Sequence, residues 1–110
     1  MVDKRYNIPE KYLLALRIIQ PARIQDIEKA VAEIWPDEMD KRTPSRLQAV
    51  HEKMRLDGNL VTVRRGTYLL DQQGMMNAQT LMKERDIDNI RMFLMKQQRR
   101  RYHRQARWLG

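Results

Sequence analysis

The segment from residue 43 to residue 71 constrains the fold most, because it contains a complete helix, a stop and a tight hairpin. Pro44 suits the first turn of a helix, where its missing N–H costs nothing, and Thr43 is expected to cap that helix. Apolar residues then recur at spacings of three and four, at Leu47, Val50 and Met54. This period predicts one stripe packed against a core, and Gly58 supplies the left-handed residue that ends the helix. We therefore predict a helix over residues 44–57.

The side of this helix opposite the stripe is polar and mostly small or basic. It carries Ser45, Gln48, Ala49, Glu52, Lys53 and Arg55. Residues at these spacings share one helix face. Such a face can enter a groove.

A hairpin is predicted directly after the helix. Residues 60–63 and 67–70 are rich in β-branched and apolar side chains, and only Arg64, Arg65 and Gly66 lie between them. A connection this short forms a hairpin turn, and Gly66 is expected to take its positive φ angle. The turn would hold two guanidinium groups at its tip.

A helix followed by a short hairpin with a basic tip resembles the recognition helix and wing of the winged helix-turn-helix family. Within that family, residues 9–72 are similar to the amino-terminal domain of Mrr-type restriction enzymes. The similarity rests on Arg46, the apolar stripe, Gly58 and the run Arg65-Gly66-Thr67-Tyr68-Leu69-Leu70. It implies a mainly α fold with a small β-hairpin, in which helix 44–57 enters the major groove of DNA and wing 59–71 contacts the backbone or minor groove. The sequence carries no nuclease domain, so no cleavage activity is expected.

The resemblance also implies DNA contacts. Base edges would be read by Ser45, Gln48, Ala49 and Glu52. Phosphates would be held mainly by Arg42, Arg46, Lys53, Arg55, Arg64 and Arg65, with Thr43 at the start of the helix. The arginine-rich tail lies outside this resemblance, and its composition suggests further phosphate contacts through Arg99, Arg100, Arg101 and Arg104.

The distribution of charge favours a polyanionic partner. The chain has a formal net charge of +8, and residues 41–65 contain seven Lys or Arg against two Asp or Glu. Residues 75–110 contain nine against three, whereas residues 1–40 contain six against eight. A basic stripe of this kind is typical of nucleic-acid binders, although a charge excess also serves solubility.

Two helices are predicted before this segment, after a loose, polar stretch at residues 1–8. The first starts at Pro9 and runs to Ile19, and the second follows Ala22 and ends near Ile34. The break between them at Gln20-Pro21 could supply a short strand beside the wing. Trp35 is expected to close the core, and the connection to residue 42 has room for an extra helical turn.

The remaining residues, 75–110, are predicted to form a helical arm that is capped by Asn77 and ends in a basic tail. The chain is therefore expected to divide into a winged-helix domain (1–74) and this arm (75–110). An apolar seam on the arm favours a homodimer formed through Ile87, Ile90, Phe93 and Leu94. Arginines interleaved with Tyr102, His103 and Trp108 suit phosphate backbones and unstacked bases. A disordered solubilising tail and an interfacial membrane anchor remain alternatives.

No catalytic constellation is apparent in the sequence. The absence of cysteine excludes disulfides and thiolate zinc sites, and His51 is expected to be structural. Asp37, Glu38 and Asp40 could hold a divalent ion, but the glycine-bearing calcium-loop pattern is absent. We expect no enzyme activity, no cofactor and no metal site.

The leading hypothesis is therefore double-stranded DNA binding by a transcription regulator or DNA organiser. With neither an export signal nor a spanning segment in view, we expect a cytoplasmic, nucleoid-associated protein, and membrane partners are not expected. Two alternatives stay open. One is a protein-interaction adaptor using a winged helix that no longer binds DNA and a Met-rich arm. The other is an RNA or membrane-surface binder working through the arginine tail.

Overall fold

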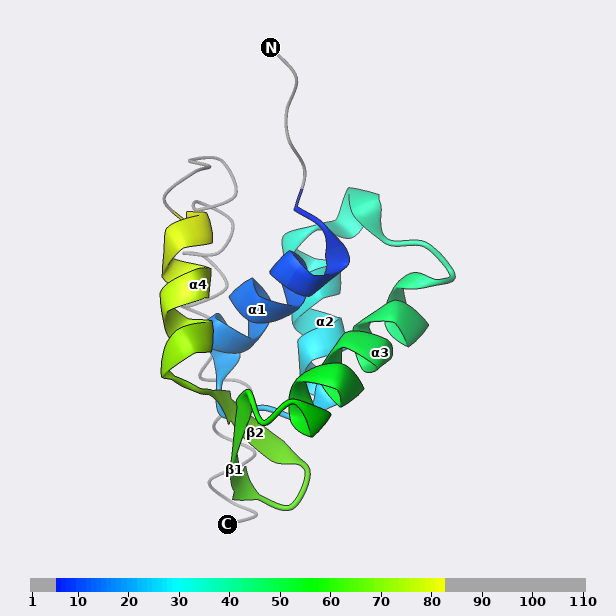
Figure 1. Ribbon diagram of the computed structural model, residues 1–110. Coiled ribbons are helices and arrows are strands. Elements are labelled where there is room, and N and C mark those ends of the chain that lie inside the picture. Colours follow the sequence, from blue (N-terminus) through cyan, green and yellow to red (C-terminus); the bar gives the residue numbers. More distant parts are fainter. Residues whose placement is uncertain (1–5, 83–110) are drawn as a thin grey trace.

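A computed structural model describes residues 6–82, and they form a mainly helical fold with one two-stranded antiparallel hairpin (Figure 1). This confirms the predicted combination of helices and a small hairpin. The elements are α1 (Ile8–Ile19), α2 (Ile24–Ile34), the 3-10 turn η1 (Pro36–Glu38), α3 (Thr43–Leu56), β1 (Leu60–Arg64), β2 (Thr67–Leu70) and α4 (Gln72–Met82).

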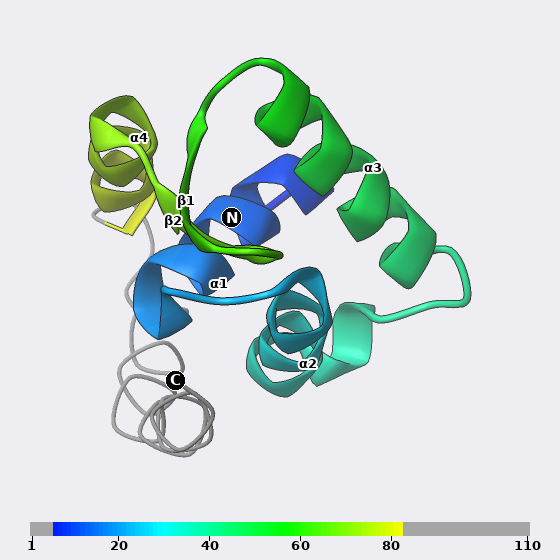
Figure 2. The ribbon, with the colours of Figure 1, turned by 90° about the horizontal axis from the view of Figure 1, so that it is seen from below.

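Helix α1 is central and lies between α4 on one side and α2 and α3 on the other (Figures 1 and 2). Its apolar residues supply much of the core, and Tyr12, Leu14, Leu16 and Ile19 have no exposed surface or almost none. Fully buried residues of the neighbouring helices meet them, including Ile27 and Val31 of α2, Leu47 of α3 and Ala78 of α4.

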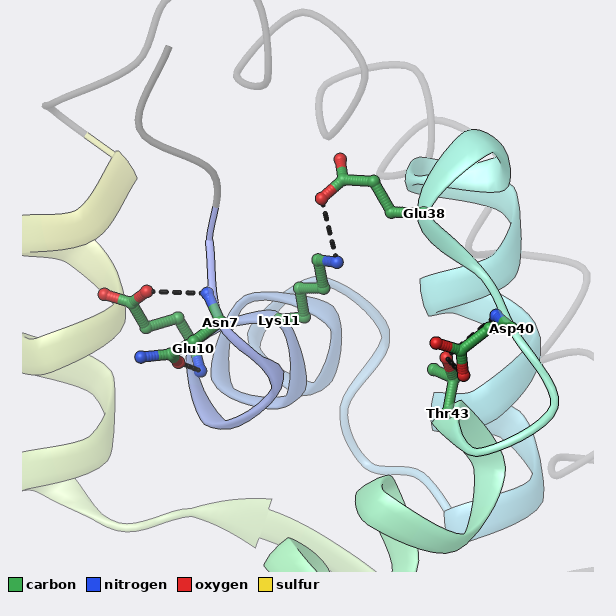
Figure 3. A network of polar contacts seen from close by, with 6 residues as sticks. All are labelled: Asn7, Glu10, Lys11, Glu38, Asp40 and Thr43. Carbon is green, nitrogen blue, oxygen red and sulfur yellow. Dashed lines mark hydrogen bonds and ion pairs between the residues drawn. The ribbon is translucent and has the colours of Figure 1, made fainter. Parts of the chain in front are cut away.

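The start of α1 differs from the prediction. Asn7 caps the helix: its Oδ1 accepts a hydrogen bond from the Glu10 amide, and Glu10 Oε1 accepts one from the Asn7 amide, both at 2.9 Å (Figure 3). The helix therefore begins at Ile8, one residue before Pro9. The prediction of a loose segment is wrong at Tyr6, which is buried and donates its hydroxyl proton to the Leu81 carbonyl oxygen at 2.8 Å.

The connection between α2 and α3 closes one end of the core. Trp35 is 1% exposed and packs edge-on against Tyr6, which confirms its predicted position, and the 3-10 turn η1 confirms the extra turn. Lys11 is a buried cation whose Nζ is 3.0 Å from Glu38 Oε1 (Figure 3). The same Nζ lies over the Trp35 ring, 5.8 Å from its centroid.

The hairpin pairs Leu60 with Leu70 and Thr62 with Tyr68, and its register is irregular between Thr62 and Arg64. Gly58 and Gly66 both have φ of +77°, as predicted for the helix stop and the turn. The strand expected at the α1–α2 connection is present as a single bridge. Ala22 donates its N–H to the Tyr68 carbonyl at 3.0 Å, and Tyr68 donates to the Ala22 carbonyl at 2.9 Å.

Helix α4 begins earlier than expected. Asp71 Oδ1 accepts a hydrogen bond from the Gly74 amide at 2.8 Å and so caps a helix that starts at Gln72. The prediction that Asn77 is the cap is wrong, because Asn77 lies inside α4. Helix α4 crosses the boundary suggested between residues 74 and 75, and Ala78 packs in the core.

The predicted dimer seam and the arginine tail lie outside the described residues. Between residues 6 and 82, the helices are all too short or too polar to span a bilayer.

Candidate nucleic-acid interface

Helix α3 has one side in the core and the other in solvent. Leu47 is fully buried, and Val50 and Met54 are half-buried against the core, which confirms the predicted stripe. The opposite side is exposed at every position expected to contact DNA except Thr43. These exposed residues are Arg42, Ser45, Arg46, Gln48, Ala49, Glu52, Lys53 and Arg55. We call them, together with Arg64 and Arg65, the basic face.

Thr43 is the exception: its predicted role as helix cap is wrong, and its burial leaves almost no surface for the predicted DNA contact. The helix begins at Thr43, which is only 2% exposed. Its Oγ1 donates to Asp40 Oδ1 and accepts from the Asp40 amide, each at 3.0 Å (Figure 3). Asp40 also accepts from the Arg42 amide at 2.8 Å, and this bond, followed by the Thr43 hydroxyl, lowers the pKa of the Asp40 carboxyl. Thr43 is thus a buried residue that attaches the start of α3 to the preceding loop through its hydrogen bonds to Asp40.

The hairpin turn presents both of its arginines to solvent, since Arg64 and Arg65 are exposed. Figure 1 shows the hairpin next to the carboxyl-terminal end of α3, with its turn directed away from α4. In Figures 1 and 2, α3 and α4 lie on opposite sides of α1. Helices α3 and α4 are therefore separated by α1, although Lys53 of the basic face lines a pocket that α4 also borders.

His51 joins α3 to both α1 and the hairpin. Its Nδ1 is hydrogen bonded to the Tyr12 hydroxyl at 2.7 Å, and its ring centroid lies 5.2 Å from that of Tyr68. Burial, more than any neighbouring charge, lowers the pKa of His51, and burial likewise raises the pKa of Tyr12. These contacts confirm the structural role predicted for His51 and fix the hairpin relative to α3.

Several side chains of the basic face have partners within the protein, and two of these interactions affect how the face could meet DNA. Gln48 Nε2 donates to Glu28 Oε1 of α2 at 2.8 Å. Arg55 donates from Nε to Glu52 Oε2 at 3.2 Å and from Nη2 to Glu52 Oε1, and this pairing lowers the pKa of Glu52. The Glu52 carboxylate, which would repel a phosphate, is thereby offset by a cation three residues away.

Glu28 is a residue of this site that the sequence did not identify. Acidic and basic residues alternate along the outer side of α2, and such a pattern indicates only a solvated surface. Which of those residues reaches α3 depends on how the two helices pack, so the sequence alone contained no signal for it.

The acidic residues near η1 do not form a metal site. Glu38 pairs with Lys11, and Asp40 bonds to Thr43. Among the residues that the structure describes, no three His, Cys, Asp or Glu side chains are grouped so as to hold a metal ion.

A pocket of about 360 Å³ is lined by residues of α1, α3, α4 and the loop before the hairpin. The apolar lining comes from Pro9, Leu13, Val50 and Met54, and Lys53, Asp57, Asn59, Asp71 and Asn77 contribute polar groups. An apolar group could be accommodated there.

Apolar side chains are also exposed at the end of α3 and on β1. Leu56 is 70% exposed, and Val61 and Val63 are each 47% exposed. Such residues form protein contacts more often than contacts with phosphates.

Comparison with known proteins identifies no relative: no protein-family model, no curated protein and no solved structure matches the chain.

Proposed function

We propose that this protein is a winged helix-turn-helix protein that binds double-stranded DNA and acts as a transcription regulator or DNA organiser without enzymatic activity. In this proposal α3 enters the major groove, and the hairpin is the wing, which contacts the phosphate backbone or minor groove. The resemblance in sequence between residues 9 and 72 is the basis for this pose.

One observation carries the proposal. The apolar side of α3 is held in the core while its basic side is exposed, and next to it a hairpin presents two arginines in solvent. The order of elements supports the same interpretation, because α1, α2, α3 and an antiparallel hairpin follow one another as in a winged helix. The bridge between Ala22 and Tyr68 supplies the third strand position on which a wing rests.

The structure changes the expected roles of individual residues. Arg42, Arg46, Lys53, Arg64 and Arg65 are exposed and suited to phosphates. Arg55 would have to leave Glu52 to contact a phosphate, so its net contribution should be smaller. Thr43 is no longer proposed to contact DNA, because it is buried.

The proposal is tested by fluorescence anisotropy with labelled random duplex, single-stranded DNA and RNA at several salt concentrations. With about five or six phosphates neutralised, log affinity for duplex should fall with log salt with a slope of roughly −5. Arg64→Ala/Arg65→Ala should weaken duplex binding and reduce the magnitude of that slope by about 2. A slope near zero, or a preference for single strands or RNA, would contradict the proposal.

A matched control separates the wing from net charge. Gln72→Glu/Gln79→Glu changes the charge by the same amount at exposed positions of α4, on the far side of α1. It should leave the slope almost unchanged. If both double variants weaken binding equally, or neither does, the hairpin is not a contact surface and the arginine tail becomes the better candidate.

A second function is favoured by the exposed apolar residues. Leu56, Val61 and Val63 would suit a protein partner, as in an adaptor whose winged helix does not bind DNA. In that case duplex affinity in the anisotropy experiment would be weak and insensitive to Arg64 and Arg65.

A further inference from the structure

The hydrogen bond between Gln48 and Glu28 determines which way the Gln48 amide faces. Gln48 lies on the exposed side of α3, and Glu28 is a half-buried residue of α2, 20 positions earlier in the chain. An ionised carboxylate has only acceptor sites, so the group that meets Glu28 Oε1 at 2.8 Å must be the amide nitrogen of Gln48. The opposite orientation would bring two oxygen acceptors together.

The consequence is that, among residues 6–82, the carbonyl end of Gln48 has no hydrogen-bond partner. The amide has two N–H donors and one carbonyl oxygen, and Glu28 occupies one donor. A free glutamine can rotate to present either its oxygen or its nitrogen first, but this one presents an acceptor together with its remaining donor.

The described residues one turn before and after Gln48 on α3 are hydrogen bonded to other groups. Glu52, one turn further along α3, is bonded through both carboxylate oxygens to Arg55. Ser45, on the preceding turn, donates its hydroxyl proton to the Arg42 carbonyl at 3.0 Å.

We propose that Glu28 is a positioning residue that orients Gln48 to read a base bearing an exocyclic amino group, adenine before cytosine. This inference rests on the proposed DNA-binding function. In the major groove, adenine N6 and cytosine N4 carry donors, whereas guanine O6 and thymine O4 are acceptors that the Gln48 oxygen would repel. Adenine ranks first because its N7 accepts the second N–H of the amide.

Glu28 also has an opposite effect on overall affinity. Its carboxylate lies beside the basic face, so it opposes phosphate while it orients Gln48. Removing its charge should therefore raise affinity for random DNA and lower discrimination between bases. A residue that only supports the fold would not change these two quantities in opposite directions.

The test is selection of binding sites from a randomised duplex library, followed by anisotropy on single-base variants of the selected site. Wild type should prefer adenine or cytosine over guanine or thymine at one position by about tenfold. Gln48→Ala should abolish the preference at that position alone. Glu28→Gln should reduce it severalfold, because the new amide can meet Gln48 in either orientation, and should strengthen binding to random duplex.

Glu33→Gln is the charge-matched control, since it removes one carboxylate from an exposed position of the same helix. It should leave base preference unchanged. Thermal melts followed by circular dichroism should show all three surface variants folded like wild type.

The outcomes separate the two proposals. Suppose that wild type binds duplex with the expected salt slope. The positioning role is then overturned by either of two results: no base position responds to Gln48→Ala, or Glu28→Gln has only the effect of Glu33→Gln. The DNA-binding proposal stands in both cases. If wild type does not bind duplex, both proposals fall.

Discussion

The buried pair of Lys11 and Glu38 predicts an asymmetric response to substitution. The Lys11 side chain is 6% exposed and that of Glu38 is 19% exposed. Glu38→Gln leaves an ammonium group enclosed without its counterion, whereas Lys11→Met removes the charge and leaves the carboxylate on the side open to water.

The expected magnitudes follow from these exposures. Breaking a fully buried ion pair by removing one partner costs about 3–5 kcal/mol. Water can approach through the Glu38 side, and the Trp35 ring 5.8 Å from Nζ still stabilises the cation, so we expect Glu38→Gln to cost about 2 kcal/mol. Lys11→Met should cost under about 1 kcal/mol, because methionine can fill the space of the lysine stem.

Urea unfolding monitored by circular dichroism measures both changes. A loss of about 2 kcal/mol lowers the midpoint by roughly 1 M urea for a domain of this size, and lowers the melting temperature by roughly 10 °C. Asp37→Asn, which removes an exposed carboxylate from the same turn, is the control and should lie within about 0.5 kcal/mol of wild type. The reasoning is refuted if Lys11→Met costs as much as Glu38→Gln, or if Glu38→Gln matches the control.

Two other predictions concern His51 and Gly66. Because burial lowers the pKa of His51, the unfolded chain takes up the proton first, so stability should fall as the pH drops below about 6.5 and level off below the folded-state pKa. His51→Gln should remove this pH-dependent decrease in the free energy of unfolding, measured by urea titrations at about pH 5.5 to 7.5. If the variant shows the same decrease as wild type, His51 is not its source. Gly66→Ala should cost about 1 kcal/mol in thermal melts because φ is +77° in otherwise open space, and Gly66→Asn should cost less; equal melting temperatures for the two variants would be inconsistent with this origin.

Local patterns in the sequence predicted local structure well. The spacing of Leu47, Val50 and Met54 identified the buried side of α3, and Gly58 and Gly66 identified its end and the hairpin turn. These features depend on the helical period and on allowed backbone angles, which neighbouring residues determine.

Predictions that depended on tertiary contacts were less successful. Thr43 has the chemistry of a cap, but packing buries it and its hydroxyl bonds to Asp40. The prediction of Asn77 as a cap missed Asp71, because the sequence does not show at which residue the chain leaves β2 and begins α4. Of the candidate site, the exposed residues followed from the helical period, but the partner of Gln48 required the packing of α2 on α3.

The attachment of the hairpin has a consequence for any attempt to isolate a minimal fragment. Its second strand is held by main-chain bonds to Ala22 and by the Gln20 side chain, whose Oε1 accepts from the Leu70 amide at 2.9 Å. A peptide beginning at α2 would lack both supports, and a lone two-stranded ribbon is marginal in water. The shortest portion able to present the two turn arginines in a fixed direction must therefore retain residues 20–22 along with α3, although nearly 40 positions of sequence separate that tripeptide from the first strand.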